Sequence, residues 1–484
     1  MILTGRREIF TDETEITAKN IPLILKEAYP IHQKNRIEIE YLQKYEKGIQ
    51  PILFRKKQIR PEINFKVVEN HANEITTFKV GYIFGSPITF VQRASVDSKD
   101  REGKKDDERI SLLNEMMFEE RKPSQDQALG KDLAVCGIGY RIVLPKKVHN
   151  GVSVFDMLKL NPLSTFVVKF NDMYKRPAVG VSYVVNTKDN SIKVGAYTKD
   201  TYFELVGCGT GEFKVVSATP HLIGAIPIIE YKYDNEYMGC FERVISLLDA
   251  LNEATADRLN GLSQFVQSIL WMNNCELNTA QMDELKDKLG LMTKSEPGNP
   301  ASVQYLTATL DQSQTQTLID YLYEQVLQIA GVPGREQSTG GNTGQAIMLS
   351  NGWQIAENHA RNFEPIFEDS ERQMLAVALN IIRKVMGDSM GALSLSDIEV
   401  KFSRNRTDSL LVKTQGLMNQ LQAGIHPLVA ISNCGLYSDP QSVWNDSRAY
   451  LGKWLYEEEE DEIPEIKRSG GEDNEENIQR VSAE

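Results

Sequence analysis

Residues 311–345 read DQSQTQTLIDYLYEQVLQIAGVPGREQSTGGNTGQ, and the rest of the chain is organised around them. Apolar side chains recur here at spacings of three and four residues, the pattern of one buried face on an α-helix: Leu318, Tyr321, Leu322, Val326 and Ile329. Gly331, Pro333 and Gly334 end this helix, because proline lacks an amide hydrogen and glycine tolerates the positive φ of a helix C-terminus. We therefore predict a helix from Asp311 to Ala330 that stops by residue 333.

A polar loop is predicted next, over residues 334–344. After Gly334 it contains three glycines and no apolar side chain, so it cannot bury itself. The charges of Arg335 and Glu336 cancel, and the remaining side chains offer hydrogen bonds without a fixed charge: Gln337, Ser338, Thr339, Asn342 and Thr343. Two interpretations stand. The loop is a mobile surface connection, or it is held out on two long helices to touch something that passes beside it.

A second, longer helix is predicted over residues 345–387, with apolar positions from Ile347 to Ile381. At about 1.5 Å per residue it would span roughly 60 Å, longer than a compact domain usually allows. Pro365 lies in its interior and removes one backbone hydrogen bond. We therefore expect a bend at Pro365.

Composition excludes some classes of protein. A chain of 484 residues has room for two to four domains, and 41% hydrophobic with 25% charged residues is ordinary for a soluble globular protein. The segment 457–484 holds twelve acidic and three basic residues, so the other 456 residues carry only −4 of the net charge of −13. We predict a disordered acidic tail there. This balance argues against a broad basic face that grips nucleic acid.

The remaining patterns predict a mixed α+β fold. Short β-type runs separated by turn residues indicate a small, mostly antiparallel sheet: Tyr140–Leu144, Thr165–Phe170, Ala178–Val185, Ile192–Tyr197 and Tyr202–Val206. An apolar stripe predicts a helix over residues 241–272, and a strand is expected at Val303–Leu306. Further on we expect an extended piece and three helices, at Ile398–Phe402, Ser409–Ala423, Pro427–Ile431 and Pro440–Tyr456. Residues 1–33 are predicted to form a loosely attached arm.

No catalytic or cofactor site is predicted. The six histidines are isolated, without the spacing of metal ligands. The glycine-rich loop follows a helix and lacks the Gly-Lys-Ser/Thr of a phosphate-binding loop. The five cysteines form no Cys-x-x-Cys pair, and the longest apolar run, Leu222–Ile229, is too short to cross a bilayer. We therefore expect a protein without a cofactor that is neither an enzyme nor a membrane protein.

The order of several short motifs resembles that of another group of proteins. The motifs are Tyr45-Glu-Lys-Gly-Ile-Gln50 with the basic Arg55-Lys-Lys57, Phe78–Pro87, Gly224–Glu230, Leu248-Asp-Ala-Leu-Asn252 and Asp257-Arg-Leu-Asn260. In this order and spacing they resemble the portal proteins of tailed double-stranded-DNA bacteriophages, specifically those of long-tailed phages with Gram-positive hosts. The resemblance covers residues from about 30 to 435.

The resemblance implies a division of the chain into named parts. These are a wing of helices and antiparallel sheet (34–240), a stem helix (241–272), a clip (273–310), a second stem helix (311–333), a tunnel loop (334–344), a long kinked helix (345–387), and a return to the wing followed by a helical crown (388–456). The arm (1–33) and the acidic tail (457–484) fall outside this plan.

The resemblance also implies a function and partners. The chain would form a ring, commonly a dodecamer, at one capsid vertex of the virion, and would assemble in the host cytoplasm with the major capsid and scaffold proteins. Double-stranded DNA would be packaged and later ejected through the channel, past Arg335, Gln337, Ser338, Thr339, Asn342 and Thr343. The clip would dock the large terminase subunit and, later, the head-completion or adaptor protein.

The charges of the two stem helices fit that role. Acidic side chains predominate on both helices: Asp249, Glu253 and Asp257 on the first, and Asp320 and Glu324 on the second, which has no basic residue. An acidic wall does not hold phosphate, so DNA could slide past it. The alternative is a scaffold or assembly protein of the phage head that forms no channel, for which long helices and an acidic tail are equally suitable.

Overall fold

The structure is a computed structural model. It describes residues 3–58, 61–92, 102–147, 151–189, 191–207, 211–266, 269–274, 300, 302–306, 312–334, 352–387, 393–403, 410–437, 443–444 and 447. The chain divides into two compact units, Met1–Ser409 and Leu410–Glu484. The predicted tail and most of the predicted clip and tunnel loop lie outside the described residues.

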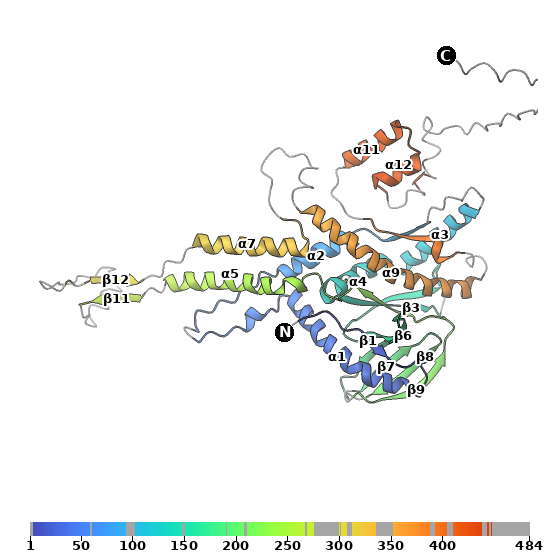
Figure 1. The fold of residues 1–484 in the computed structure, drawn as a ribbon, viewed down its shortest axis with the longest axis horizontal. Coiled ribbons are helices and arrows are strands. Elements are labelled where there is room, and N and C mark those ends of the chain that lie inside the picture. The colour runs from blue at the N-terminus through green and yellow to red at the C-terminus, as the bar shows by residue number, and fades with distance from the viewer. Residues whose placement is uncertain are drawn as a thin grey trace, which may run out of the picture. The chain divides into compact units, whose positions relative to one another are not determined.

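Helices and sheets are both present in the first unit, which confirms the α+β prediction (Figure 1). Its α-helices are α1 (Ile21–Glu46), α2 (His71–Phe84), α3 (Glu102–Glu119), α4 (Lys122–Cys136), α5 (Ile245–Val266), α7 (Gln312–Ala330) and α9 (Trp353–Met386). Short 3-10 helices are η1 (Pro51–Phe54), η2 (Glu242–Val244) and η3 (Leu395–Asp397). The second unit contains α11 (Leu410–Gln422) and α12 (Pro427–Cys434), close to two of the predicted helices.

The largest sheet has six strands in the order β1-β5-β6-β7-β8-β9. They are β1 (Ile9–Thr11), β5 (Thr165–Phe170), β6 (Pro177–Val185), β7 (Ile192–Tyr197), β8 (Thr201–Gly207) and β9 (Phe213–Pro220). Every neighbouring pair is antiparallel except β1 with β5. The prediction of a mostly antiparallel sheet is therefore confirmed.

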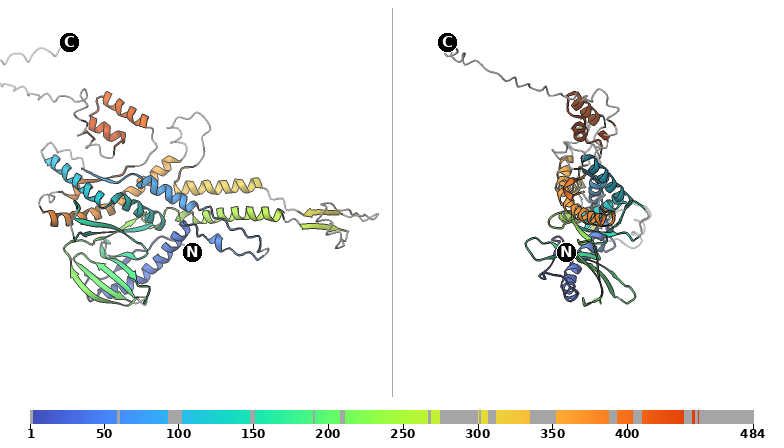
Figure 2. Two further views of the ribbon diagram at one scale, coloured as in Figure 1. Left: turned by 180° about the vertical axis from the view of Figure 1, so that it is seen from behind. Right: turned by 90° about the vertical axis from the view of Figure 1, so that its right-hand side faces the viewer.

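Three smaller sheets complete the described strands. A three-stranded sheet orders β10 (Ile228–Lys232), β3 (Ile138–Pro145) and β4 (Phe155–Leu160). β13 (Ile398–Lys401) pairs with β2 (Thr89–Gln92), and β11 (Ile269–Asn273) pairs with β12 (Ser302–Leu306), both antiparallel. Figures 1 and 2 show the six-stranded and three-stranded sheets close together, with α5 and α7 running away from them and the β11–β12 pair beyond the far ends of the two helices.

The N-terminal segment is part of the fold, so the prediction of a loose arm over residues 1–33 was wrong. Its strand β1 extends the six-stranded sheet, with Ile9 opposite Val168. α1 then begins at Ile21 and continues through Pro30 to Glu46 as one helix. Ile21, Ile24 and Leu25 are buried and belong to the core that α1 shares with this sheet. Parallel pairing with a strand more than 150 residues away leaves no local signature in the sequence.

The first predicted stem helix, 241–272, is shorter than expected. α5 is described from Ile245 to Val266, and residues 269–273 form strand β11. The segment Ile-Leu-Trp-Met-Asn suits a strand as well as a helix, because β-branched and aromatic side chains favour strands. Its antiparallel partner β12 decides the outcome. The strand predicted at Val303–Leu306 is confirmed within β12.

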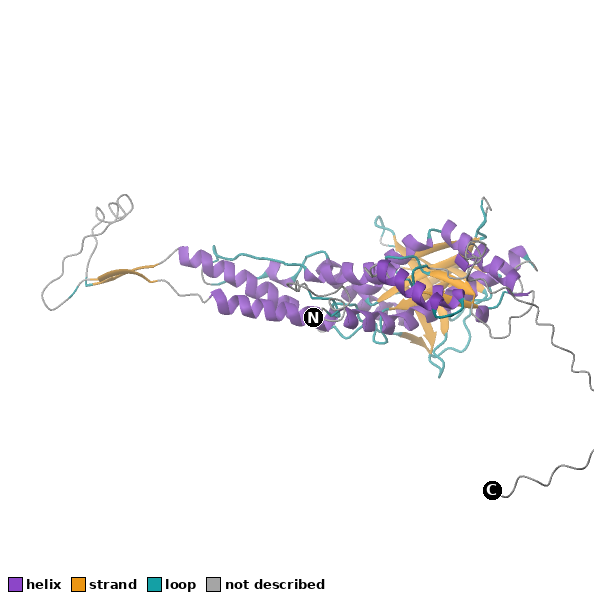
Figure 3. Ribbon diagram, turned by 90° about the horizontal axis from the view of Figure 1, so that it is seen from above, coloured by secondary structure: helices purple, strands orange, loops and turns teal. Residues whose placement is uncertain are grey.

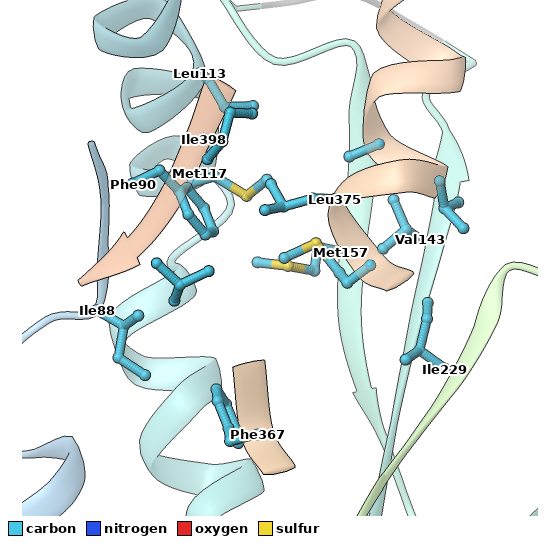
Figure 4. Close-up of a cluster of buried hydrophobic side chains, with 14 of the residues drawn as sticks. Ile88, Phe90, Leu113, Met117, Val143, Met157, Ile229, Phe367, Leu375 and Ile398 are labelled. Atoms are coloured by element: carbon cyan, nitrogen blue, oxygen red, sulfur yellow. The ribbon is translucent and has the colours of Figure 1, made fainter. Parts of the chain in front are cut away.

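The largest hydrophobic core joins α9 to the small sheets (Figure 4). Phe367 and Leu375 of α9 lie in one buried cluster with Val143, Met157 and Ile229 of the three-stranded sheet. Phe90, Leu113, Met117 and Ile398 close the cluster from β2, α3 and β13. Burying each such side chain is worth about 1.5–3 kcal/mol. α9 is therefore held along most of its described length.

Candidate functional site

α5 and α7 lie side by side, and the hairpin of β11 and β12 is drawn beyond their ends (Figure 3). The two helices meet α2 and the preceding loop at a cavity of about 330 Å³. His71 forms one wall, and its ring centroid lies 4.5 Å from that of Tyr323 on α7. Arg258 of α5 donates a hydrogen bond to Gln316 of α7 at the same cavity. These contacts fix the direction in which α5 and α7 extend from the rest of the unit.

His71 is held between two carboxylates. Its Nε2 atom lies 2.8 Å from Oε2 of Glu69, and its Nδ1 atom lies 2.7 Å from Oε2 of Glu74. Burial alone would lower the pKa of His71, but the two carboxylates outweigh burial and raise it above its usual value of 6.5. Tyr323 also donates to Glu74, at 3.0 Å. Tyr323 of α7 is therefore joined to α2 by its contact with the His71 ring and its hydrogen bond to Glu74.

Three of the motifs that carry the sequence resemblance, Tyr45–Gln50 with Arg55–Lys57, Leu248–Asn252 and Asp257–Asn260, meet on one side of α5. Tyr45 donates a hydrogen bond of 2.8 Å to Asp249, although the two are 204 residues apart. Buried Asn252 and Asn260 accept hydrogen bonds from the backbone amides of Glu69 (3.0 Å) and Phe65 (2.7 Å). A buried amide without a partner costs about 1–3 kcal/mol. Asparagine at these positions therefore fixes the loop after η1 along α5.

The basic cluster of this loop neutralises part of the predicted acidic face, a pairing that sequence reasoning missed. Arg55 lies 2.9 Å from Asp257 and 3.7 Å from Glu253, and Lys57 lies 3.7 Å from Asp257. Burial raises the pKa of Asp249 above its usual value, while the hydrogen bond from Tyr45 opposes that shift. The three acids of α5 are thus brought together, but they do not form a bare acidic wall.

The acids of α7 have a different environment. Asp320 and Glu324 are both exposed, and Asp320 accepts a hydrogen bond of 2.6 Å from Gln316. Within the part of the chain that the structure describes, neither carboxylate has an ion pair. The helix itself contains no lysine or arginine. The unpaired negative charge of the helix pair is therefore concentrated on α7.

The helix α7 ends at a tight crossing with α9. Gly331 has a φ of +64°, and a side chain there would lie 2.6 Å from the His359 ring. Lys79 donates a hydrogen bond of 2.9 Å to the Gly331 carbonyl, and burial lowers the pKa of Lys79 to about 8. The predicted tunnel-loop residues, 335–344, follow directly and lie outside the described residues. Pro365 lies inside α9; a bend there stays a prediction.

A buried ion cluster fixes the start of α5. Arg6 of the N-terminal segment lies 3.2 Å from Glu38 of α1 and 3.1 Å from Glu242 of η2, directly before α5. Burial raises the pKa of Glu242 to about 7, against the opposing effects of Arg6 and the Gly239 amide. The cluster ties α1 and the first strand to the base of the helix pair.

A second buried cluster ties α9 to the rest of the unit. Glu371 lies 2.7 Å from Arg141 and 3.1 Å from Lys122, and Asp126 pairs with both cations. Burial would raise the pKa of Glu371, but Lys122 and Arg141 together lower it below its usual value. Tyr231 adds a hydrogen bond of 2.9 Å to Glu371. No sequence pattern marked these residues as a group.

A larger cavity, of about 710 Å³, lies where the six-stranded sheet, β10 and α9 meet. Its innermost cation, Lys169, lies 2.8 Å from Glu8 and 2.9 Å from Glu230. The two carboxylates neutralise the charge of Lys169, and these ion pairs stabilise the wall of the cavity. We assign it a structural role.

Two kinds of feature are absent from the described residues, a membrane-spanning helix and a cluster of metal ligands. None of the helices in the described ranges combines the length and apolarity needed to span a bilayer. In the same ranges, histidine, cysteine, aspartate and glutamate side chains form no group of three or more that could hold a metal ion. The described helix pair is fixed at the start of α5 by one buried ion cluster, and the β11–β12 pair lies beyond its other end.

Comparison with known proteins assigns this architecture to a family. A search of curated proteins found no match. A family model described as phage portal protein, SPP1 Gp6-like, matches residues 25–475 of the chain. The match includes α5, α7 and α9 together with every described strand except β1. The chain therefore belongs to the SPP1 Gp6-like family of phage portal proteins.

Proposed function

We propose that this portal protein assembles into a ring at one capsid vertex, and that the ring encloses a channel for double-stranded DNA. The observation that carries the proposal is the helix pair α5 and α7, which belongs to a chain matched by the portal family along residues 25–475. Genomic DNA would pass inward during packaging and outward during ejection. A dodecamer is the subunit number that we expect.

In this ring α5 and α7 would form the stem, and the segment 273–310 the clip. The β11–β12 pair supports this proposal, because it places the first residue of the clip segment beside a strand in its last third, with Asn273 opposite Ser302. Paired strands beyond the ends of the helix pair suit docking. We propose that it contacts the large terminase subunit first and the head-completion or adaptor protein afterwards.

The charge of the helix pair supports a channel through which DNA moves, and not a surface that binds DNA tightly. Two of the acids on α5 are balanced by Arg55 and Lys57, and those of α7 remain without ion pairs in the described residues. No row of cations is therefore offered to the phosphate backbone, whose affinity depends on lysine and arginine contacts. DNA that is held weakly can move.

The remaining parts are assigned by the same plan. Residues 334–344, rich in neutral hydrogen-bonding side chains, would be the tunnel loop, and α9 would span wing and channel. The helices after residue 409 would form the crown. Assembly would take place in the host cytoplasm with the major capsid and scaffold proteins, and the finished ring would remain in the virion.

Electron microscopy of the purified protein, with native mass measured in parallel, tests the proposal. Closed rings of about a dozen subunits with a central hole are the expected result. Monomers or open aggregates at every concentration, also in the presence of scaffold and capsid proteins, would overturn the ring and favour a head scaffold or assembly factor without a channel.

A further inference from the structure

The end of α7 and the start of α9 meet beside α2. Gly334 is the last described residue after α7, and Gly352 is the first one before α9. A side chain added at Gly352 would lie 3.5 Å from Cα of Pro333 and 3.8 Å from the amide nitrogen of Gly334. The chain therefore leaves and returns at one point. We call this point the neck, with an outgoing half, residues 331–334, and a returning half, residues 352–353.

The outgoing half of the neck is fixed at the end of α7. The amide of Val332 donates to the Leu327 carbonyl at 2.9 Å. That of Gly331 donates to the Gln328 carbonyl at 3.2 Å, which completes the two bonds of a Schellman motif. Buried Lys79 of α2 then donates to the Gly331 carbonyl at 2.9 Å, where its positive charge faces the negative end of the helix dipole. A lysine of α2 thus holds the point at which the chain leaves α7.

The returning half of the neck is fixed by the same helix. Trp353 of α9 contacts the rings of Phe78 and Tyr82, whose centroids lie 5.9 and 6.0 Å from its own. The two rings of α2 stack on each other at 5.6 Å. The Tyr82 hydroxyl also donates a hydrogen bond of 2.9 Å to Glu357, one turn further along α9. Three side chains of α2, those of Phe78, Lys79 and Tyr82, therefore reach both halves of the neck.

The support beneath the neck is itself anchored in the core. Ile83 of α2 and Leu129 of α4 are buried in the same hydrophobic cluster, so α2 is held independently of the neck. Figure 1 shows α2 beside the end of α7 and the start of α9. The His359 ring of α9 leaves no room at Gly331, where a side chain would lie 2.6 Å from it. Joining the two ends of a flexible segment costs entropy, and these contacts offset that cost.

We infer that Phe78, Lys79 and Tyr82 of α2 form a clamp that holds the neck closed while DNA passes, and so positions residues 335–351. The inference rests on the proposed channel, in which residues 334–344 are the tunnel loop. A closed neck keeps both ends of that loop in place relative to α2, even when moving DNA pulls on the loop. If the two halves of the neck were held separately, each could open alone. In a shared clamp, opening one half loosens the other.

Hydrogen exchange of the full-length protein, measured by mass spectrometry, tests whether the clamp is shared. Lys79→Met removes the hydrogen bond to the outgoing half and keeps the aromatic contacts. Tyr82→Phe removes the hydrogen bond to Glu357 and keeps the ring. The matched control, Lys66→Met, removes an exposed lysine that donates to the Leu53 carbonyl at 2.8 Å. Circular dichroism with thermal unfolding confirms that each variant is folded.

Lys79→Met should speed exchange at the amides of residues 331–332 by about tenfold or more, because a hydrogen bond from a buried charged donor is lost. It should also speed exchange at residues 355–356, whose amides donate to the Gly352 carbonyl in the returning half. The lysine donates only to the outgoing half, so this second effect reports the shared clamp. Tyr82→Phe should have the reciprocal effect, and the control should exchange as the unmodified protein does.

The role in DNA passage is tested by DNA protected from nuclease in filled heads, beside ring counts from electron microscopy. Lys79→Met should form rings in normal number and lose protected DNA. Faster exchange confined to residues 331–332 would overturn the shared clamp and leave Lys79 as a cap of α7. Coupled exchange with normal packaging would overturn the role in DNA passage and leave the ring intact. If the unmodified protein forms no ring, the proposed function fails, while the exchange data still decide whether α2 holds the neck.

Discussion

Arg141 and Glu371 are 230 residues apart in the chain, yet Nη1 of Arg141 lies 2.7 Å from Oε1 of Glu371, and both side chains are fully buried. Arg141 belongs to β3 and Glu371 to α9, so the pair joins a central strand to the longest described helix. Burying two ions is costly, and the cost is offset only when their other polar atoms also form hydrogen bonds or ion pairs. Lys122, Asp126 and Tyr231 supply most of those contacts, whereas Nε of Arg141 has no hydrogen-bond partner among the described residues.

Replacing Glu371 by alanine should lower the free energy of unfolding by about 3–5 kcal/mol, because Arg141 and Lys122 would be left buried without their shared partner. Urea unfolding followed by circular dichroism measures this loss. The matched control is Glu368→Ala on the same helix, whose ion pair with Arg372 is partly exposed and should be worth about 0.3–0.5 kcal/mol. Equal losses of unfolding free energy in the two variants would show that the buried cluster contributes no more to stability than a partly exposed ion pair does.

His71→Gln should destabilise the protein more in mild acid than in mild alkali. The pKa of His71 is raised by Glu69 and Glu74, so its stabilising charge is fully present below its ordinary pKa of 6.5. That contribution is lost as the pH rises through the raised pKa. The difference in unfolding free energy between the unmodified protein and the variant, measured at about pH 6 and about pH 9, should therefore shrink with rising pH.

His32 should show the opposite dependence of stability on pH and therefore serves as an internal comparison. Burial lowers its pKa to about 4, so the folded protein holds it neutral. Its effect on stability is favourable above pH 6.5 and is lost as the pH falls toward 4. A His32→Gln variant should consequently flatten the acid side of the stability profile. A His71→Gln difference that grows with pH would contradict the conclusion that Glu69 and Glu74 raise the pKa of His71.

Gly331→Ala should weaken the end of α7. The residue has a φ of +64°, a region that costs a residue with a Cβ atom about 1–2 kcal/mol, and the new methyl group would lie 2.6 Å from the His359 ring. We expect a lower midpoint of thermal unfolding. Gly334→Ala is the control, since open space surrounds that position. A variant at Gly331 as stable as the control would show that the crossing of α7 and α9 is loose.

Three lysines in place of Gln337, Ser338 and Thr339 should leave ring assembly unchanged and impair DNA packaging. Each new cation would bind phosphate and slow movement through the channel. Packaging is measured as DNA protected from nuclease in filled heads, beside ring counts from electron microscopy. A conservative variant, Gln337→Asn with Ser338→Thr and Thr339→Ser, should package normally. Normal packaging by the lysine variant would remove residues 334–344 from the channel.

Local patterns predicted several elements well. The strands at Thr165–Phe170 and Ile192–Tyr197 have the predicted bounds, and α7 has its predicted end at Ala330, where Gly331 stops it. In these segments the local preference and the tertiary surroundings agree. Where they do not, the prediction failed: residues 269–273 form a strand because β12 lies beside them, and residues 9–11 form one because β5 does.

The candidate site was predictable only in part. The acids Asp249, Glu253 and Asp257 were found from their place on one helix, but the basic cluster that pairs with them lies on a loop far earlier in the chain. Distance along the sequence says nothing about such a pairing. The two buried asparagines, Asn252 and Asn260, gave one signal in advance: both belong to motifs that carried the family resemblance.

The sequence by itself determined which segments form helices or strands where the periodicity was strong, where α7 stops, and which family the motifs resemble. Those properties depend on neighbouring residues, through side-chain spacing and the backbone limits of glycine and proline. Only the tertiary structure decided that Arg141 meets Glu371 and that Arg55 meets Asp257. Ion pairs and surfaces depend on distances through space, which folding sets by burying the apolar faces of remote segments together.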